Sequence, residues 1–345
     1  MRTYTDVHQI LFAPGALTAA DLQMFAANPQ GTDSSGLSAE MKTYYSDYLI
    51  DNAEPLLIHA QFGQKRNIPR HGGKTVEFRK YTPLAKITGA LTEGVTPDGQ
   101  SLNMTTLEAS VKQIGGYVTL TDLILATAID DNMVEATELL GEQAGRSVDT
   151  IVRDILNGGT NVQYADGSVS ARNLLVGGAA SDNHYLTVDC VRRAVRFLKA
   201  QNAKKINGDY IGIIHPDCTY DLTSDPDWKY PHQYQDTKEL YDGEIGKVAG
   251  VRFVETTEAK IFAGAGKDGR DVYSTLIIAK DAYGVTEIEG EGLEHIVKQL
   301  GSGGTADPLD QRATAGWKYT GTAVRLVEQF MVRIETASTF ASGEN

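Results

Sequence analysis

Several short stretches of the sequence contain residue types that could bind phosphate or activate a nucleophile. The run HGGKT at residues 71–75 resembles the end of a phosphate-binding loop, but the first glycine of that motif would fall at Ile68. The GAGK run at residues 264–267 lacks the Ser or Thr that should follow, and the GSGG run at residues 301–304 is not the GxSxG turn that presents a nucleophilic serine. We interpret these runs as turns.

Metal-binding residue types are sparse in this sequence. The seven histidines are scattered singly without an HExxH pattern, and the two cysteines are widely separated. The HPDC run at residues 215–218 could supply two ligands, although a turn at the end of a strand is the simpler interpretation. The DPD run at residues 225–227 lacks the further oxygens and the glycine of a calcium loop. The sequence therefore predicts no cofactor, no metal site and no catalytic centre, so we expect a protein that is not an enzyme.

Composition restricts the class of protein further. With 345 residues and 41% hydrophobic content, the chain can bury a large core. Its net charge of -13 repels polyanions and argues against a dedicated nucleic-acid binder, but it is compatible with a container for DNA, whose wall should adhere only weakly. Two cysteines and the absence of a secretory apolar region indicate synthesis in a reducing cytoplasm. No apolar stretch is long enough to span a membrane, so no membrane partner is expected.

The elements that would position any functional residue are organised around residues 132–157, where apolar residues recur at helical spacing. These positions are Met133, Thr137, Leu140, Ala144, Val148, Ile151 and Ile155. Gly158 and Gly159 favour the end of a helix there. The predicted helix would be roughly 39 Å long, which makes it a spine for the fold. Gly141 and Gly145 weaken its middle.

A projecting hairpin is predicted before this helix. Residues 74–80 alternate apolar and charged side chains as a half-buried strand does, and residues 107–120 form a plausible return strand. The apolar parity changes across Gly115 and Gly116, which indicates a bulge or bend. The long connection between the strands is rich in Pro and Gly, and such a connection does not fit inside a compact domain. An extended hairpin that reaches away from the body accounts for both features.

Further elements follow the spine. A helix is predicted from about Thr187, and its polar face carries a basic set of residues. The set is Arg192, Arg193, Arg196 and Lys199, followed by Lys204 and Lys205. This face is either solvated or in contact with a neighbour's carboxylates or enclosed DNA. Short strands are predicted at residues 211–214, 248–254, 276–279 and 285–288, which is typical of a mixed α/β unit.

The two ends of the chain differ in pattern. Residues 1–36 read as an arm without a core of its own, and a helix is predicted from residue 37 to about residue 58. Near the other end, apolar residues of one parity predict a single long strand over residues 323–334, which would span roughly 40 Å. A strand and a spine helix of matching length, packed side by side, predict an elongated domain.

Seven blocks of the sequence, in order, resemble the major capsid protein family of tailed double-stranded DNA bacteriophages. The blocks are HAQFGQKRNIPRHGGKTVEFRKYTPL (59–84), LTEGVTPDGQSL (91–102), KQIGGYVTLTDL (112–123), LLGEQAGRSVDTIVRDIL (139–156), HPDCTYDL (215–222), GEIGKVAGVRFVET (243–256) and DPLDQRATAGWKYTGTAVRL (307–326). Together they cover most of the chain, from about residue 40 to residue 335. Several blocks in a fixed order are far more specific than any single short motif.

The resemblance implies the α+β shell fold that tailed phages share with encapsulins and the herpesvirus capsid floor. This fold has an elongated peripheral (P) domain with a long spine helix and long strands, and an axial (A) domain near the symmetry axes of the capsomers. It also has an extended loop (E-loop) that forms a hairpin, and an N-terminal arm. The expected division of this chain is an arm at 1–36, P-domain segments at 37–73, 117–205 and 302–345, an E-loop at 74–116, and an A domain at 206–301.

The resemblance also implies a structural function. Copies of the chain would self-assemble as hexamers and pentamers into an icosahedral shell that encloses double-stranded DNA by weak, non-specific contact. Portal, scaffold and decoration proteins are further expected partners. The location would be the virion capsid, after synthesis and assembly in the bacterial host cytoplasm. An encapsulin-like compartment that holds a cargo enzyme remains the alternative.

The residues expected to carry this function lie in the hairpin and the spine. We expect one set of hairpin residues to make apolar contacts with a neighbouring subunit: Phe78, Tyr81, Leu84, Leu91 and Val95. A second set would fix the register through charge pairs: Arg79, Lys80 and Glu93. The simpler interpretation of each is an ordinary hairpin residue. Gly141 and Gly145 would act as a hinge where the helix bends as shell curvature changes.

Overall fold

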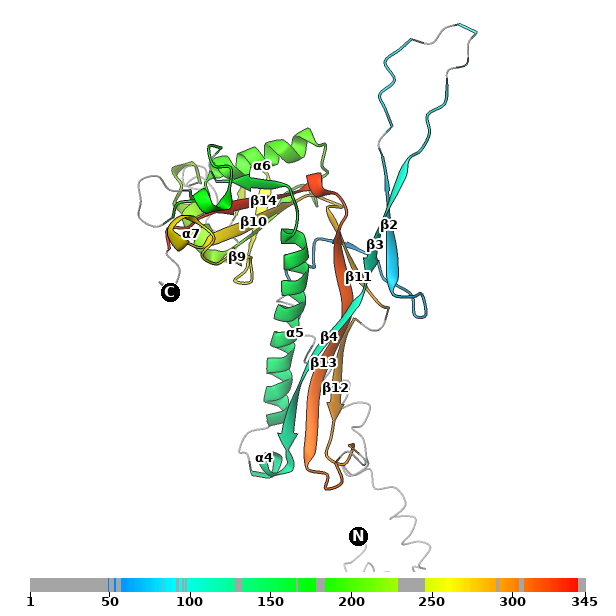
Figure 1. The fold of residues 1–345 in the computed structure, drawn as a ribbon, viewed down its shortest axis with the longest axis vertical. Coiled ribbons are helices and arrows are strands. Elements are labelled where there is room, and N and C mark those ends of the chain that lie inside the picture. Colours follow the sequence, from blue (N-terminus) through cyan, green and yellow to red (C-terminus); the bar gives the residue numbers. More distant parts are fainter. Residues whose placement is uncertain are drawn as a thin grey trace, which may run out of the picture.

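The computed structural model describes residues 49, 53, 57–82, 84–90, 93–94, 96, 98–127, 132–165, 167–177, 184–228, 246–289, 292–303 and 307–340. The described chain is elongated, with one long helix lying beside long strands, a second sheet near one end of that helix, and a hairpin that rises from the body (Figure 1). The expected arm at 1–36 lies outside the described residues. Of the helix expected at 37–58, the structure describes Leu49 and Ala53, which are helical and buried, and residues 57–58, which are not helical.

The spine helix α5 spans Asn132–Asn157, the limits predicted from the sequence. Its buried face includes Leu140, Ala144 and Val148. These residues pack with Trp317 and other residues of the neighbouring strand β13 (Arg312–Arg325). Toward its C-terminus, the buried residues Val152 and Leu156 enter a second apolar cluster, which also contains residues of the second sheet. The helix therefore contributes to the cores beneath both sheets.

The first sheet is built around β13 (Arg312–Arg325), the longest strand. The strand β4 pairs antiparallel along one edge of β13, while β11 and β12 follow one another along the other edge, and β1 adds to β11 in parallel. The bounds of these strands are β1 Gln64–Lys65, β4 Lys112–Thr121, β11 Tyr283–Glu287 and β12 Leu293–Lys298. A short helix, α4 (Asp122–Thr127), follows β4 at the far end of the sheet (Figure 1).

The bend predicted at Gly115 and Gly116 is wrong, because both glycines lie inside β4 and pair regularly with β13. The chain changes partner earlier, at Val111, whose N–H donates to the Lys74 carbonyl at 3.0 Å. The glycines allow a close approach instead. A Cβ at Gly115 would lie 2.5 Å from the Trp317 carbonyl oxygen, and one at Gly116 would lie 2.9 Å from Oε1 of the Gln143 side chain.

The second sheet has the strand order β5-β14-β10-β6-β8-β7, and β9 also pairs with β10. The bounds are β5 Val162–Tyr164, β6 Tyr210–Ile214, β7 Lys247–Val248, β8 Val251–Glu255, β9 Ile261–Phe262, β10 Val272–Ile278 and β14 Met331–Thr336. Helices α6 (Val188–Ala200) and α7 (Pro216–Ser224) pack with it through a large apolar cluster. As predicted, α6 starts after Thr187, whose side chain caps it.

The single long strand predicted over residues 323–334 is wrong. The strand β13 ends at Arg325, a short 3₁₀ turn (Glu328–Phe330) follows, and β14 then enters the second sheet. The N–H groups of Leu326 and Val327 both donate to the Ala282 carbonyl, at 2.9 and 3.1 Å, and this turns the chain from one sheet to the other. The polar residue Glu328 lies in this turn, at a position where the alternation would require an apolar residue.

The strand predicted over residues 248–254 is also two strands. Ala249 and Gly250, with φ of 52° and 83°, form a tight turn between β7 and β8, which pair antiparallel. Such φ values are typical of two-residue hairpin turns. Strand pairing also crosses the division expected at residue 301, because β11 and β12 pair with β13 while β14 pairs with β10. The domain limits themselves stay a prediction.

No helix within the described residues is long and apolar enough to cross a membrane. Among these residues there is also no group of three or more His, Cys, Asp or Glu side chains placed to hold a metal ion.

Candidate interaction surface

The projecting hairpin consists of β2 (Thr75–Tyr81), β3 (Met104–Ser110) and the residues between them. The two strands pair in regular antiparallel register, and the ladder continues where Thr82 N–H donates to the Asn103 carbonyl at 2.9 Å. Beyond this point the two arms separate into a long open loop, well away from the two sheets (Figure 1). A ribbon of two strands has little stability of its own, so its root must be held by the body.

Phe78 holds the root of the hairpin on β11. Its side chain is only 3% exposed, and its ring lies so close to Gly284 that a Cβ there would be 2.6 Å from the ring. The Arg66 guanidinium lies 5.9 Å from the centre of the ring, and its Nη1 donates to the Glu77 carbonyl at 2.8 Å. The expectation that Phe78 contacts a neighbour is therefore corrected, because its own chain covers the ring.

The outer part of the hairpin exposes apolar side chains. They are Tyr81, Leu84, Ile87, Leu102 and Met104, and Ile87 and Leu102 are 77% and 70% exposed. Tyr81 and Leu84 were expected here from the sequence, whereas the other three were missed, although each stands in or beside the Gly- and Pro-rich connection. Such a gathering of exposed apolar groups is typical of a surface that another protein covers.

The remaining residues expected in the hairpin are three charged residues and two apolar ones. Arg79 and Lys80 are exposed and border, with Asp281, a hollow of about 310 Å³ at the root of the hairpin. Glu93 is exposed near the tip. Leu91 and Val95 lie outside the described residues.

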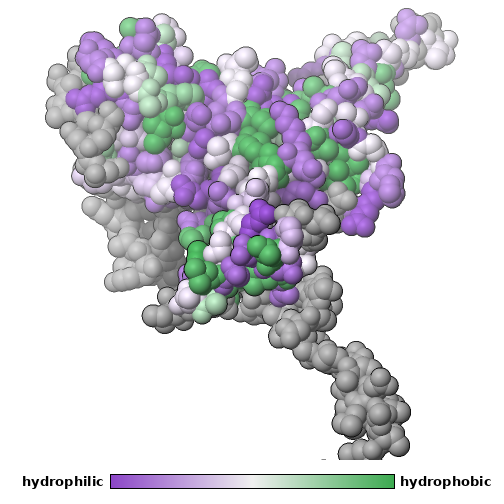
Figure 2. Space-filling model, turned by 60° about the horizontal axis from the view of Figure 1, so that its bottom comes forward, coloured by the Kyte–Doolittle hydropathy of each residue, from purple (hydrophilic) through white to green (hydrophobic). Residues whose placement is uncertain are grey.

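A second apolar surface lies at the end of the molecule where α4 follows β4, and it was not predicted from the sequence. Leu123 and Ile124 of α4 are exposed, and Leu309, before β13, is 75% exposed. Figure 2, in which this end comes forward, shows green patches among the hydrophilic residues there. The apolar pair Leu123 and Ile124, which comes shortly after β4, is the sequence feature from which this surface could have been predicted.

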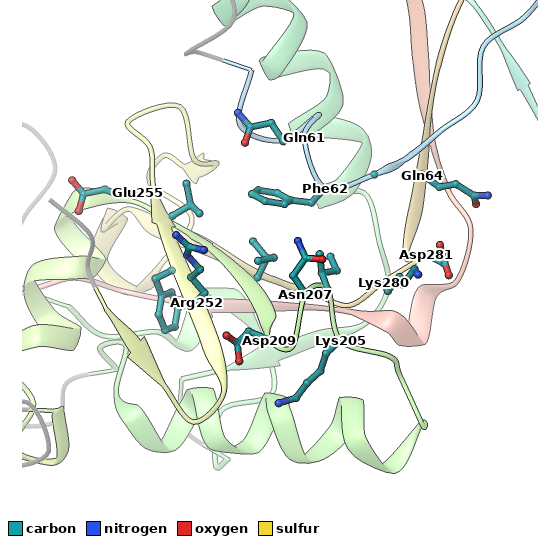
Figure 3. Close-up of a pocket in the computed structure, with 15 residues that line it drawn as sticks. Gln61, Phe62, Gln64, Lys205, Asn207, Asp209, Arg252, Glu255, Lys280 and Asp281 are labelled. Carbon is teal, nitrogen blue, oxygen red and sulfur yellow. The ribbon is translucent and has the colours of Figure 1, made fainter. Parts of the chain in front are cut away.

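A cleft of about 990 Å³ lies between the segment after Gln61, the turn before β6, and the strand β8 (Figure 3). Its rim carries both charges, with three cations and three carboxylates. They are Lys205, Arg252 and Lys280, and Asp209, Glu255 and Asp281. Asp209 is paired with Lys247 at 2.6 Å. The described lining contains no Ser, Cys or His, and its polar side chains are mainly these charged groups.

Residues that the sequence had singled out as possible metal ligands have other roles. His215 Nδ1 accepts the Asp217 N–H at 3.2 Å and caps α7, while the buried Cys218 Sγ lies 3.7 Å from Thr336 Oγ1. Burial lowers the pKa of His215 and raises the pKa of Cys218. A thiol in this setting stays protonated, so it is a poor ligand and a poor nucleophile.

The basic face of α6 is partly neutralised within the chain. Arg192 pairs with Asp227 at 2.7 Å, and Arg193 pairs with Asp189 at 3.1 Å and also donates to the Ala165 carbonyl. Arg196 and Lys199 are exposed on the same helix. The face therefore presents fewer free charges than its sequence suggests.

The two glycines of the spine are both buried. Gly141 and Gly145 thus belong to the packed face of α5, and their expected role as a hinge stays a prediction. At these positions, any bending of the helix would have to take place against the packed core.

A long helix beside a sheet of long strands, a second sheet at one end and a projecting hairpin together define a subunit of the phage capsid fold. Similar solved structures include the capsid of cyanophage P-SCSP1u, with a TM-score of 0.61 and 15% identity over 95% of this chain and 98% of that chain. The capsid of Ralstonia phage GP4 gives a TM-score of 0.60 at 16% identity, over 92% of this chain and 97% of that one. The cyanophage Pam1 capsid gives 0.60 at 14% identity, over 94% and 100%.

At these identities the likeness establishes the fold, and the family follows from the sequence. A family model described as phage capsid protein matches residues 104–332. The chain belongs to this phage capsid protein family. It is a structural protein of the virion shell, which copies of it form, and it is not an enzyme. No curated protein sequence matches it.

Proposed function

We propose that copies of this chain associate as hexamers and pentamers into an icosahedral shell around double-stranded DNA, with the projecting hairpin of each copy laid over a neighbour. The observation that carries this proposal is the set of exposed apolar side chains on the hairpin, including Ile87 and Leu102. Arg79, Lys80 and Glu93 fix the register of the contact, and Leu91 and Val95 add to its apolar part.

The energetics of such a contact favour assembly of many copies. Burial of apolar surface contributes about 25 cal/mol per Å², so each hairpin adds a modest free energy. Because every subunit of a closed ring makes the same contact, these contributions act together through a high effective concentration. The apolar end around Leu123 and Leu309 is a second candidate contact between copies.

The further partners follow from family membership and charge. A chain with a net charge of -13 holds DNA only by weak, non-specific contact, which suits a container whose contents must leave. Portal, scaffold and decoration proteins complete the particle, which assembles in the bacterial host cytoplasm. In this proposal residues 1–36 form the arm, and α5 with the first sheet forms the P domain. The A domain is the second sheet with α6 and α7, so it departs from the expected limits of 206–301: it includes β5, α6 and β14 and leaves out β11 and β12.

Removal of the open loop tests the role of the hairpin. Residues 83–102 are replaced by Asn-Gly, a two-residue turn that can close the ladder because Thr82 and Asn103 already pair. We expect a soluble, folded protein that forms no shells under conditions in which the wild type does, as seen by electron microscopy and size-exclusion chromatography.

A matched pair of substitutions separates apolar contact from loop length. Ile87→Ser with Leu102→Ser should reduce the yield of shells, whereas Thr105→Ser with Thr106→Ser, exposed on the same hairpin, should leave it unchanged. Full-size shells from the shortened hairpin would contradict the proposal. Particles that contain one packaged enzyme would instead favour the cargo-compartment alternative.

A further inference from the structure

A buried pair of hydrogen bonds between His59 and Asp149 joins the segment before β1 to the middle of the spine helix. The backbone N–H of His59 donates to Asp149 Oδ1 at 2.7 Å, and His59 Nδ1 lies 2.6 Å from Asp149 Oδ2. His59 is 1% exposed and Asp149 is 0% exposed. Both side-chain oxygens of Asp149 are therefore used by one residue, His59. Such a bidentate contact fixes the position of His59 on the helix.

Tyr283, the first residue of β11, holds the same segment from the other side. Its hydroxyl donates to the His59 carbonyl at 2.5 Å, and Gly63 packs so closely on its ring that a Cβ there would lie 2.6 Å from Cε2. Burial raises the pKa of Tyr283, and the negative charge of Asp149 raises it further, so the hydroxyl remains a donor. Three parts of the chain that are far apart in the sequence thus meet at one buried point.

The contacts continue from this point to the root of the projecting hairpin. Directly after Gly63, β1 pairs with Gly284 and Val285 of β11, and Ile68 N–H donates to the Glu287 carbonyl at 2.8 Å. Gly284 is also the residue against which the Phe78 ring packs. Two adjacent residues of β11, Tyr283 and Gly284, therefore hold the His59–Asp149 contact and the hairpin root.

We propose that His59, Asp149 and Tyr283, which we name the buried latch, are positioning residues that set the direction in which the projecting hairpin leaves the body. The reason is that the latch cannot yield gradually: opening it leaves a carboxylate and its donors buried without partners. While it is closed, the spine, β11 and the segment that leads into the hairpin behave as one rigid unit. The consequence for assembly rests on the proposed function of the hairpin.

Amide hydrogen exchange of the full-length, unassembled protein tests the latch. The variants are Asp149→Ala, which opens it, and His59→Leu with Asp149→Leu, which refills the space with apolar groups. We expect exchange at residues 64–68 and 75–81 to rise about tenfold or more, while β6 and β10 keep their wild-type protection. Tyr283→Phe removes only the hydroxyl and should produce a smaller rise in the same segments.

The matched control is Asp154→Ala, which removes ion pairs with Arg153 and Lys260 from the outer side of the same helix and should leave the exchange of the hairpin root unchanged. Unchanged exchange at residues 64–81 in both latch variants would overturn the proposal. So would an equal rise in β6 and β10, since the latch would then support only global stability.

Assembly provides a second readout that separates this proposal from the function on which it rests. If the wild type forms uniform shells, the leucine double variant should give particles of mixed size, and uniform wild-type shells from it would refute the latch. If the wild type forms no shells at all, the proposed function fails, while the exchange experiment still decides the latch.

Discussion

Substitution of Gly115 by alanine tests how tightly β4 and β13 are packed. A Cβ at this position would lie 2.5 Å from the Trp317 carbonyl oxygen, whereas ordinary contacts begin at 3.4 Å. This oxygen is part of the backbone, and β4 pairs with β13 along its whole length, so neither strand can shift without disturbing the ladder. Overpacking of this kind typically costs about 1–3 kcal/mol, and a rigid backbone neighbour favours the upper half of that range.

Gly116→Ala is the matched comparison, because its nearest neighbour can move. The Cβ would lie 2.9 Å from Gln143 Oε1, the end of a flexible side chain. Moving this side chain sacrifices its hydrogen bond from Trp317 Nε1, now 3.1 Å long, at a cost of about 0.5–1.5 kcal/mol. Both substitutions reduce the entropy of the unfolded chain equally, so that gain cancels in the comparison. We expect Gly115→Ala to be less stable than Gly116→Ala by about 1–2 kcal/mol.

Denaturant unfolding of the unassembled protein measures this difference. In a Trp228→Phe background, Trp317 is the one remaining tryptophan of the two in the chain, so its fluorescence reports the unfolding of β13 directly. Gly115→Ala should show the lower midpoint with an unchanged slope. Equal midpoints, or a lower midpoint for Gly116→Ala, would refute the close approach of the two strands as the reason for Gly115.

Two further predictions concern pH and curvature. Burial lowers the pKa of His215 despite the carboxylates of Asp217 and Glu255, so the unfolded chain, with an imidazole pKa of about 6.5, binds a proton that the folded chain does not. The stability that depends on this group is fully present above about pH 6.5 and falls below it by at most about 1.4 kcal/mol per pH unit. His215→Asn, which keeps a cap acceptor, should flatten the decline of the melting temperature between pH 7 and 5.5, and an unchanged slope would count against this reasoning. Gly141→Ala with Gly145→Ala should stiffen the spine by raising helix propensity, so electron microscopy should show fewer uniform shells, whereas normal shells from a folded variant would remove the support for a hinge.

Elements with a strong local pattern were predictable from the sequence. The spine helix was predicted with its observed limits, since its apolar spacing and the two glycines that follow it are all local signals. The hairpin strand β2 and the helix α6 after Thr187 were found for the same reason. The ordered sequence blocks indicated the capsid family, which the family model confirms.

The tertiary structure decided what depends on residues far apart in the chain. The alternation of apolar residues continues from β13 toward β14, so the sequence does not reveal the break between the two strands. In the structure, the Ala282 carbonyl accepts from the N–H groups of Leu326 and Val327, and the chain turns there into the other sheet. The alternation in residues 74–80 places Phe78 on the apolar face of a strand but does not show what covers it, and the structure places its ring against Gly284 of the same chain. Local periodicity predicts a helix or a strand, because side chains that share one face recur every three to four residues in a helix and every second residue in a strand. Which face is covered, and by what, is fixed by contacts that form only when the whole chain has folded.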